Sequence, residues 1–90
     1  MAVGGEVPTS DRTLSRILGR ASDSNIQFNR LRLLLLRLGF EERIRGSHHI
    51  FRKDGVEERI NLQRDGSKAK VYQVRQVRAM ILRHGFADEG

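Results

Sequence analysis

Two adjacent histidines are the residues of this chain best suited to chemistry. They follow a glycine and a serine and open a short apolar and basic run, which reads Gly46, Ser47, His48, His49, Ile50, Phe51, Arg52 and Lys53. Histidine titrates nearest neutrality among the ordinary side chains, so it can take up or release a proton at working pH. A histidine beside cations therefore indicates a site that binds a phosphate backbone or that catalyses a reaction of that backbone by proton transfer.

RNA is a substrate that needs little from such a site, because its 2′-hydroxyl is a built-in nucleophile. A nuclease then requires a base, a proton donor for the leaving oxygen, and cations for the developing charge. One histidine contributes about 10²–10⁴-fold by proton transfer. The serine after Gly46 is either a further donor to phosphate or only part of a turn. The candidate phosphate partners are basic side chains: Arg45, Arg52, Lys53, Lys68 and Lys70.

The strand that carries the two histidines must separate them. Consecutive strand residues point to opposite faces, so His48 and His49 do not share a metal ion, and no acidic cluster stands nearby to complete one. We expect neither a metal nor another cofactor. The residue pattern leaves the register of this strand open. With Ile50 inward, Phe51 is an exposed stacking platform for a base; in the other register, Phe51 belongs to the core.

Composition limits the partners. The chain has 90 residues, a net charge of +6 and no cysteine. This predicts one small domain with an anionic partner: nucleic acid, an acidic protein or, less favoured, a membrane surface. Disulfides and thiolate metal sites are excluded. No apolar run reaches the roughly 18 residues of a membrane span, and the N-terminus lacks a signal-peptide pattern. We therefore expect a cytoplasmic protein that is not bound to membranes.

The first half of the chain predicts a tail and two helices. Residues 1–10 are expected to form a flexible tail, and Ser10 or Asp11 to cap an extra helix over residues 11–19. Residues 21–25 are expected to be a polar linker. A second helix begins near residue 28, with Asn29 as a candidate N-cap and Gly39 as its stop. Its inward stripe has helical spacing: Phe28, Leu31, Leu34, Leu35 and Leu38.

Two leucines of that second helix, Leu33 and Leu36, fall off the stripe. Exposed leucines in such a position require a cover. The simplest one is the extra helix, whose apolar residues share one face: Leu14, Ile17 and Leu18. A partner protein is the other cover.

The second half predicts three strands and a helix. The first strand covers about residues 40–45, the second 48–53, and the third starts at Val56 after the hairpin dipeptide Asp54-Gly55. An irregular loop is expected over residues 64–70. The last helix spans about residues 71–84, with Gly85-Phe86 as its stop. Its arginines are expected to be mostly solvated, and His84 to have a structural role at the helix end.

These elements define an α+β domain over residues 11–90, with residues 28–86 as its core. Its order is helix, three antiparallel strands and helix, preceded by the extra helix. Both core helices should cover one face of the sheet and leave the other to solvent or a ligand.

The order of motifs resembles the HicA (YcfA-like) toxins of toxin–antitoxin pairs. The residues that carry the resemblance are Leu38-Gly39-Phe40, Gly46-Ser47-His48-His49 and Ile50-Phe51-Arg52, followed by a hairpin, a third strand and a closing helix. It covers about residues 28–86. It implies a double-stranded-RNA-binding-domain-like α-β-β-β-α fold, cleavage of mRNA by an endonuclease, and a HicB-like antitoxin as partner. The catalytic position that it implies is His48, with His49 beside it.

The chain differs from that family in two places. The third strand usually ends in a Pro-x-His pattern, but here it reads Leu62-Gln63-Arg64. The helix at residues 11–19 is additional. Two classes of function therefore remain: a metal-independent toxin ribonuclease, or a non-catalytic module (an inactive toxin homologue among them) that holds RNA or an acidic partner. A short antitoxin reading frame beside this one would distinguish them.

Overall fold

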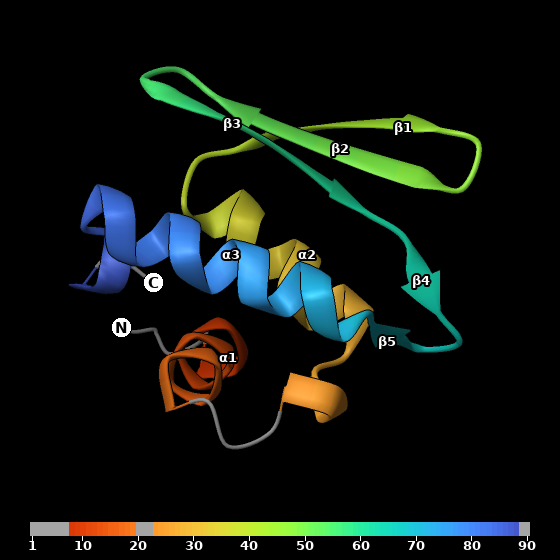
Figure 1. Ribbon diagram of the computed structural model, residues 1–90, viewed down its shortest axis with the longest axis horizontal. Coiled ribbons are helices and arrows are strands. Elements are labelled where there is room, and N and C mark those ends of the chain that lie inside the picture. Colours follow the sequence, from red (N-terminus) through yellow and green to blue (C-terminus); the bar gives the residue numbers. More distant parts are fainter. Residues whose placement is uncertain (1–7, 20–22, 89–90) are drawn as a thin grey trace, which may run out of the picture.

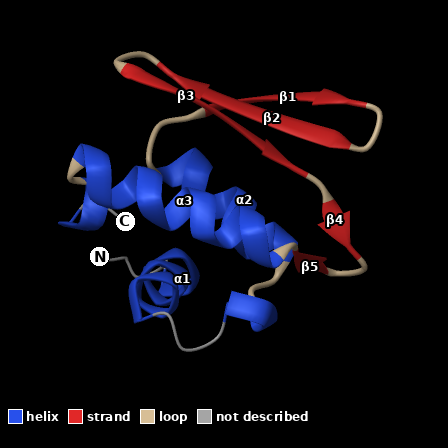
Figure 2. Cartoon of the chain, viewed as in Figure 1, coloured by secondary structure: helices blue, strands red, loops and turns tan. Residues whose placement is uncertain are grey.

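The computed structural model describes residues 8–19 and 23–88 and has an α+β architecture (Figures 1 and 2). No helix of these residues is long and apolar enough to cross a lipid bilayer. The elements in chain order are α1 (Pro8–Gly19), the 3-10 turn η2 (Asp23–Asn25), α2 (Phe28–Arg37), β1 (Glu41–Arg45), β2 (His48–Lys53), β3 (Val56–Leu62), β4 (Arg64–Asp65), β5 (Lys68–Ala69), α3 (Val71–His84) and the 3-10 turn η3 (Phe86–Asp88).

The three long strands form an antiparallel sheet in the order β1-β2-β3. Helices α2 and α3 both lie under one face of this sheet, and α1 packs on the far side of the two helices (Figure 1). The expectation of two helices on one face of a three-stranded antiparallel sheet is therefore confirmed. The other face of the sheet, called the outer face below, is covered by no described helix or strand (Figure 2).

The leucine-rich helix α2 is buried along its predicted stripe, whose residues are at most 4% exposed. The helix ends where predicted because Gly39 adopts φ +97°, a left-handed conformation that suits glycine. The Phe40 N–H donates to the Leu35 carbonyl and the Gly39 N–H to the Leu36 carbonyl, both at 3.0 Å. This Schellman pattern satisfies the last carbonyls and directs the chain into β1.

The start of α2 differs from the prediction, because Gln27 rather than Asn29 is the N-cap residue and no side chain caps the helix. The backbone supplies the missing acceptor. The N–H of Phe28 donates to the carbonyl of Ser67 at 3.0 Å, and Gln27 forms an isolated bridge with Lys68. A tertiary backbone contact thus replaces the side-chain cap that the sequence suggested.

The N-terminal helix α1 begins at Pro8, three residues before the predicted start, so Ser10 and Asp11 lie inside it and neither is the cap. Proline is favoured in a first helical turn because its missing N–H has no partner there. Residues 8–10 are thus helical rather than part of a flexible tail, and the rest of that predicted tail, residues 1–7, lies outside the described part of the chain.

The packing of α1 confirms half of the predicted cover over α2. Leu14 and Ile17 are buried, Leu18 is half-buried, and α1 contacts α2. Leu36 is half-buried against the core, whereas Leu33 is 43% exposed, so the predicted cover does not extend to Leu33.

The closing helix α3 has the predicted bounds and ends at Gly85, whose φ is +71°. Val74, Val77 and Ile81 are fully buried, as their spacing indicates. Arg78 departs from the predicted solvated face. Its guanidinium pairs with Asp23 at 2.9 Å and also donates to the Ile17 carbonyl at 3.2 Å, so it joins α3 to η2 and α1.

The segment after β3 is more regular than predicted. In place of an irregular loop, β4 and β5 pair antiparallel as a small separate hairpin around Gly66, whose φ is +63°. Its second strand is held by the Ala69 N–H, which donates to the Ile26 carbonyl at 2.9 Å. The hairpin therefore links the end of the sheet to the start of α2.

Candidate active site

The register of β2 places the two histidines on opposite faces of the sheet. His48 is paired with Arg45 and His49 with Ile44 across the β1–β2 ladder. His48 is exposed on the outer face. The side chain of His49 is 15% exposed and contacts Phe28 of α2, so it points toward the helices. The predicted separation of the two histidines is therefore confirmed.

The same alternation decides between the two placements left open for Phe51. Phe51 is fully buried, and Ile50 is half-buried on the outer face. Phe51 therefore belongs to the hydrophobic core, and the alternative in which it is an exposed stacking platform for a base is wrong. Its cross-strand partner Ile60 is also fully buried.

The imidazole of His48 is held by an amide from the neighbouring strand. Its Nδ1 lies 3.2 Å from Oδ1 of Asn61 on β3. In this orientation of the amide, Nδ1 carries the proton and donates to the oxygen, so Nε2 carries the lone pair. An exposed Nε2 with a lone pair is a proton acceptor at a fixed position on the outer face.

The turn before β2 fixes the position of His48, the first residue of that strand. Gly46 adopts φ +59°, which permits a tight turn between β1 and β2. The hydroxyl of Ser47 accepts a hydrogen bond from Nε2 of Gln63 at 3.2 Å. Ser47 is thereby tied to the chain that follows β3, and both turn residues remain exposed beside His48.

The outer face is rich in arginine. Because alternate residues share a face, β1, β2 and β3 each contribute exposed basic or acidic side chains to it. The arginines are Arg43, Arg45, Arg52 and Arg59, and the glutamates are Glu41 and Glu57. A hollow of about 810 Å³ runs along the strands, and all four of these arginines and Ile50 line it. His48 borders its Arg45 end through the β1–β2 pairing.

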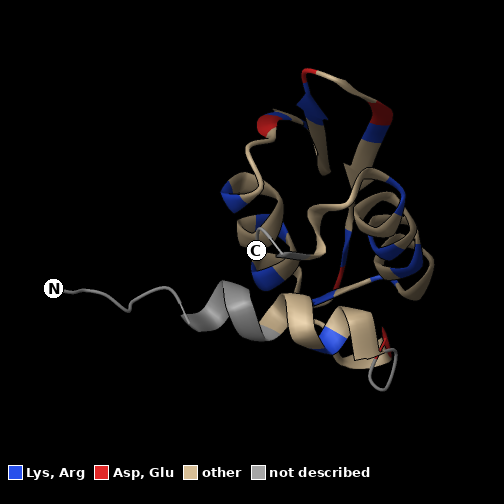
Figure 3. Cartoon of the chain, turned by 90° about the vertical axis from the view of Figure 1, so that its left-hand side faces the viewer, with Lys and Arg blue, Asp and Glu red and all other residues tan. Residues whose placement is uncertain are grey.

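Positive charge alone does not select this face. Figure 3 shows lysine and arginine on the helices as well as on the strands. What distinguishes the outer face is the combination of arginines, a lining hollow and a histidine with an exposed nitrogen. These features come together only through the strand register.

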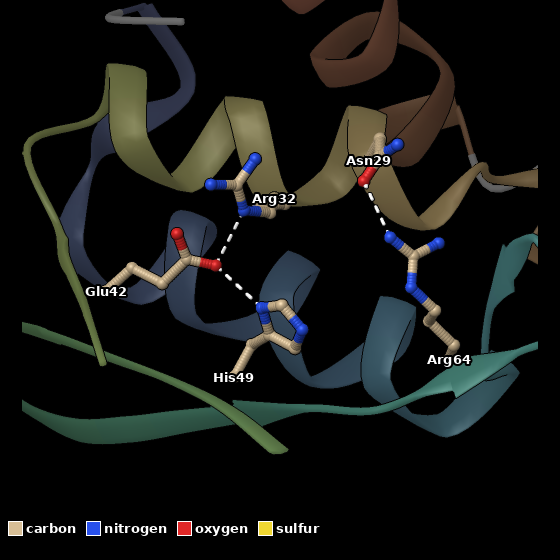
Figure 4. Close-up of polar contacts among 5 residues, drawn as sticks. All are labelled: Asn29, Arg32, Glu42, His49 and Arg64. Atoms are coloured by element: carbon tan, nitrogen blue, oxygen red, sulfur yellow. Dashed lines mark hydrogen bonds and ion pairs between the residues drawn. The ribbon is translucent and has the colours of Figure 1, made fainter. Parts of the chain in front are cut away.

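His49 takes part in a polar network beneath the sheet (Figure 4). Its Nδ1 lies 2.7 Å from Oε2 of Glu42 on β1, and Nε of Arg32 on α2 donates to the same oxygen at 2.6 Å. The side chain of Glu42 is only 9% exposed. The network therefore joins α2, β1 and β2 around one carboxylate.

The surroundings of Glu42 favour its ionised form. The hydrogen bond from Arg32 is the main influence that lowers the pKa of Glu42, and the hydrogen bond to His49 lowers it further, although burial acts in the opposite direction. A buried carboxylate with two donors is a stabilising link between layers. We therefore assign His49 a structural role, and the geometry favours His48 for chemistry.

Arg64 makes a separate set of contacts at the start of α2 (Figure 4). Its guanidinium covers the Phe28 ring at 4.4 Å from the centroid, and its Nη2 donates to Oδ1 of Asn29 at 3.2 Å. The His49 ring meets the same Phe28 ring edge-on at 4.9 Å between centroids. Arg64 stands at the position of the histidine in the Pro-x-His pattern of the resembled family. In this chain it packs on the start of α2.

The predicted lysines do not gather around His48. Lys53 lines the far end of the hollow, and its Nζ lies 5.9 Å from the centroid of the Phe86 ring, away from His48. Lys68 lies on the separate β4–β5 hairpin, where its Nζ donates to Oδ1 of Asn25 at 3.2 Å, and Lys70 is the N-cap residue of α3. Of the predicted phosphate partners, the structure brings only Arg45 and Arg52 to the outer face with His48.

Sequence reasoning missed several residues of the site. Arg43, Arg59 and Asn61 share the outer parity of their strands, which was visible in the alternation. Glu42 lies two residues after Phe40 and therefore shares its face, so the alternation indicates a carboxylate under the sheet. Its partner Arg32 lies on another element, so no spacing in the sequence connects the two.

Within residues 8–19 and 23–88, no three histidine, cysteine or acidic side chains are grouped to hold a metal ion. Comparisons of the chain with protein-family models, with curated proteins and with solved structures gave no match. The interpretation of the site therefore depends on its own geometry.

Proposed function

We propose that this chain is an endoribonuclease in which His48 is the general base. The observation that carries the proposal is the exposed imidazole on an arginine-rich face, with Nδ1 held by Asn61 at 3.2 Å. Histidine is the side chain most often used for proton transfer in catalysis. The resemblance to HicA toxins adds the expectation that the substrate is mRNA.

The reaction needs only the substrate's own nucleophile. His48 Nε2 takes the proton of the 2′-hydroxyl while the 2′-oxygen forms a bond to phosphorus. The bond from phosphorus to the 5′-oxygen then breaks, and a solvent water protonates the leaving oxygen at this exposed site. Arg45, the cross-strand neighbour of His48, offers its guanidinium to the charge that develops on the phosphoryl oxygens. The products are a 2′,3′-cyclic phosphate and a 5′-hydroxyl, and no metal ion takes part.

The fold is compatible with the proposal at the level of element order. Helix α2, strands β1 to β3 and helix α3 follow the α-β-β-β-α order that the resemblance implies for a double-stranded-RNA-binding-domain-like core. Helix α1 and the β4–β5 hairpin are additions to that order. By the same resemblance, we propose that a HicB-like antitoxin silences this chain and that both act in the cytoplasm.

Cleavage by the purified protein tests the proposal. We expect it to cut RNA in the presence of EDTA and to leave 2′,3′-cyclic phosphate ends. RNA of the same sequence with 2′-O-methyl groups should remain intact, because its nucleophile is blocked. His48→Ala, purified in parallel, should lower the rate by about 10²–10⁴-fold. In a bacterial host, expression of the wild type should arrest growth, and expression of His48→Ala should not.

Two results would contradict the proposal. Cleavage of the 2′-O-methyl RNA would show that the 2′-hydroxyl is not the nucleophile. RNA bound by the wild type but never cut would instead identify a non-catalytic RNA-binding module, the alternative that the sequence left open.

A further inference from the structure

Two arginines of the outer face are regularly spaced along one strand. Arg43 and Arg45 lie two residues apart on β1, an edge strand of the sheet, so their side chains leave the same face about 7 Å apart. Both are exposed. This separation resembles that of neighbouring phosphates in an extended single strand of nucleic acid.

An apolar position lies beside this pair of arginines. Ile50 on β2 is the cross-strand partner of both Arg43 and Asn61, so these three residues form one row across the sheet. Ile50 is half-buried and lines the hollow. The next row toward the turn holds Arg45 and His48. Arg43 and Arg45, called the basic lane below, therefore lie beside a small apolar surface that Ile50 provides.

We infer that this face binds unpaired RNA, which lies along β1 over the hollow; the inference rests on the proposed function and specifies its substrate. The phosphate to be cut lies at Arg45, next to His48, and the neighbouring phosphate lies at Arg43. The base between them rests on Ile50. This makes Arg43 and Ile50 substrate-positioning residues, in addition to His48 and Arg45.

The geometry favours a single strand over a duplex. In double-stranded RNA the base faces are stacked inside the helix, so none is available to lie on Ile50. It also favours RNA over an acidic protein, because a stable protein interface needs an apolar core. The hollow is lined mainly by charged side chains, four arginines and the carboxylates of Glu41 and Glu57 among them. Its two apolar side chains, Ile50 and Val56, do not provide such a core.

Binding measurements on His48→Ala test the lane without cleavage of the probe. We would titrate this variant with a fluorescent single-stranded RNA and with a duplex of the same sequence at several salt concentrations. We expect tighter binding of the single strand. Adding Arg43→Ala and Arg45→Ala should weaken that binding and reduce the slope of log K against log salt by about 1.4, since two phosphate contacts are lost.

A matched control removes the same charge from the helix layer. Arg30 on α2 and Arg75 on α3 are exposed. Asp23, with which Arg75 forms an ion pair at 3.7 Å, keeps its closer ion pair with Arg78 at 2.9 Å when Arg75 is replaced. Arg30→Ala with Arg75→Ala should leave the salt slope nearly unchanged. Ile50→Tyr should tighten single-strand binding severalfold, because an aromatic ring stacks on any base, and should leave duplex binding as it was.

The lane would be overturned by equal affinity for single strand and duplex, by an equal loss of slope in the helix-layer control, or by capture of poly-glutamate but not RNA by the outer arginines. The last would identify an acidic protein as the occupant. Cleavage by the wild type, together with unaltered binding when Arg43 and Arg45 are replaced, would reject the lane and keep the nuclease. Binding along the lane without any cleavage by the wild type would keep the lane and reject the nuclease.

Discussion

His48 and His49 are neighbours in the chain, yet they serve opposite faces of the sheet. The Nδ1 of His48 meets an amide oxygen of Asn61 on the open face, whereas the Nδ1 of His49 meets the carboxylate of Glu42 under the sheet. One ring is exposed and the other is packed against Phe28. The two residues should therefore respond differently to the same substitution.

The first prediction contrasts those substitutions. His48→Ala should abolish RNA cleavage and leave the free energy of unfolding nearly unchanged, because its ring is at the surface. His49→Ala should destabilise the fold by about 1–3 kcal/mol, since it removes a partner of a buried carboxylate, while the folded protein still cleaves. Cleavage rates and urea unfolding curves measure both effects. If His49→Ala is the inactive and stable variant, the assignment of the two histidines is reversed.

Most of this architecture could be predicted from periodicity. The bounds of α3, the stripe of α2 and the turn at Gly55 follow from apolar spacing and turn residues, because these are local properties. The face of each histidine could not be fixed, since a strand that is apolar on both sides leaves its register open. Burial of Phe51 decides it in the folded protein.

The interactions that sequence could not supply are those between distant elements. Gln73 lies on the inward stripe of α3 and is 1% exposed. Its side-chain amide donates a hydrogen bond to the Asn61 carbonyl and accepts one from the Gln63 N–H. Helical spacing marks Gln73 as inward but does not name its partners. The same holds for Arg32 and Glu42, whose contact exists only once α2 packs on β1.

A second prediction tests the core with a pair of neighbouring leucines. Leu35 is fully buried and Leu33 is 43% exposed on the same helix. Leu35→Asp should unfold the domain, because a buried unpaired charge costs more than about 4 kcal/mol. Leu33→Asp should change stability by less than about 0.5 kcal/mol. Circular dichroism melts of the two variants compare them directly, and a cooperative melt of Leu35→Asp near the wild-type temperature would refute the core assignment.

A third prediction concerns acid stability. The pKa of Glu42 is lowered from its ordinary value of 4.5, chiefly by Arg32 and then by His49. A lowered carboxyl pKa stabilises the fold above pH 4.5, and this contribution is lost as the pH falls below that value. Glu42→Gln should therefore be less stable than the wild type at pH 7 and should lose less stability on acidification. Urea unfolding at a series of pH values measures both slopes.

The control for that measurement is an exposed glutamate of the outer face. Glu57→Gln removes the same charge without touching the network between α2 and the sheet. Its stability at pH 7 should remain close to that of the wild type. Equal losses in the Glu57 and Glu42 variants would mean that net charge, not the contact with Arg32 and His49, sets the acid limit.

The last prediction concerns the amide that holds His48. Asn61→Ala removes the acceptor of the Nδ1 proton, so the imidazole can rotate and change tautomer, and the cleavage rate should fall although RNA still binds. Asn61→Asp keeps an acceptor but adds a negative charge, which stabilises the imidazolium. The acid limb of its pH–rate profile should therefore move to higher pH, with activity recovered at alkaline pH. A purely structural role for Asn61 would lower the rate equally at every pH in both variants, so the displacement of the limb is the decisive measurement.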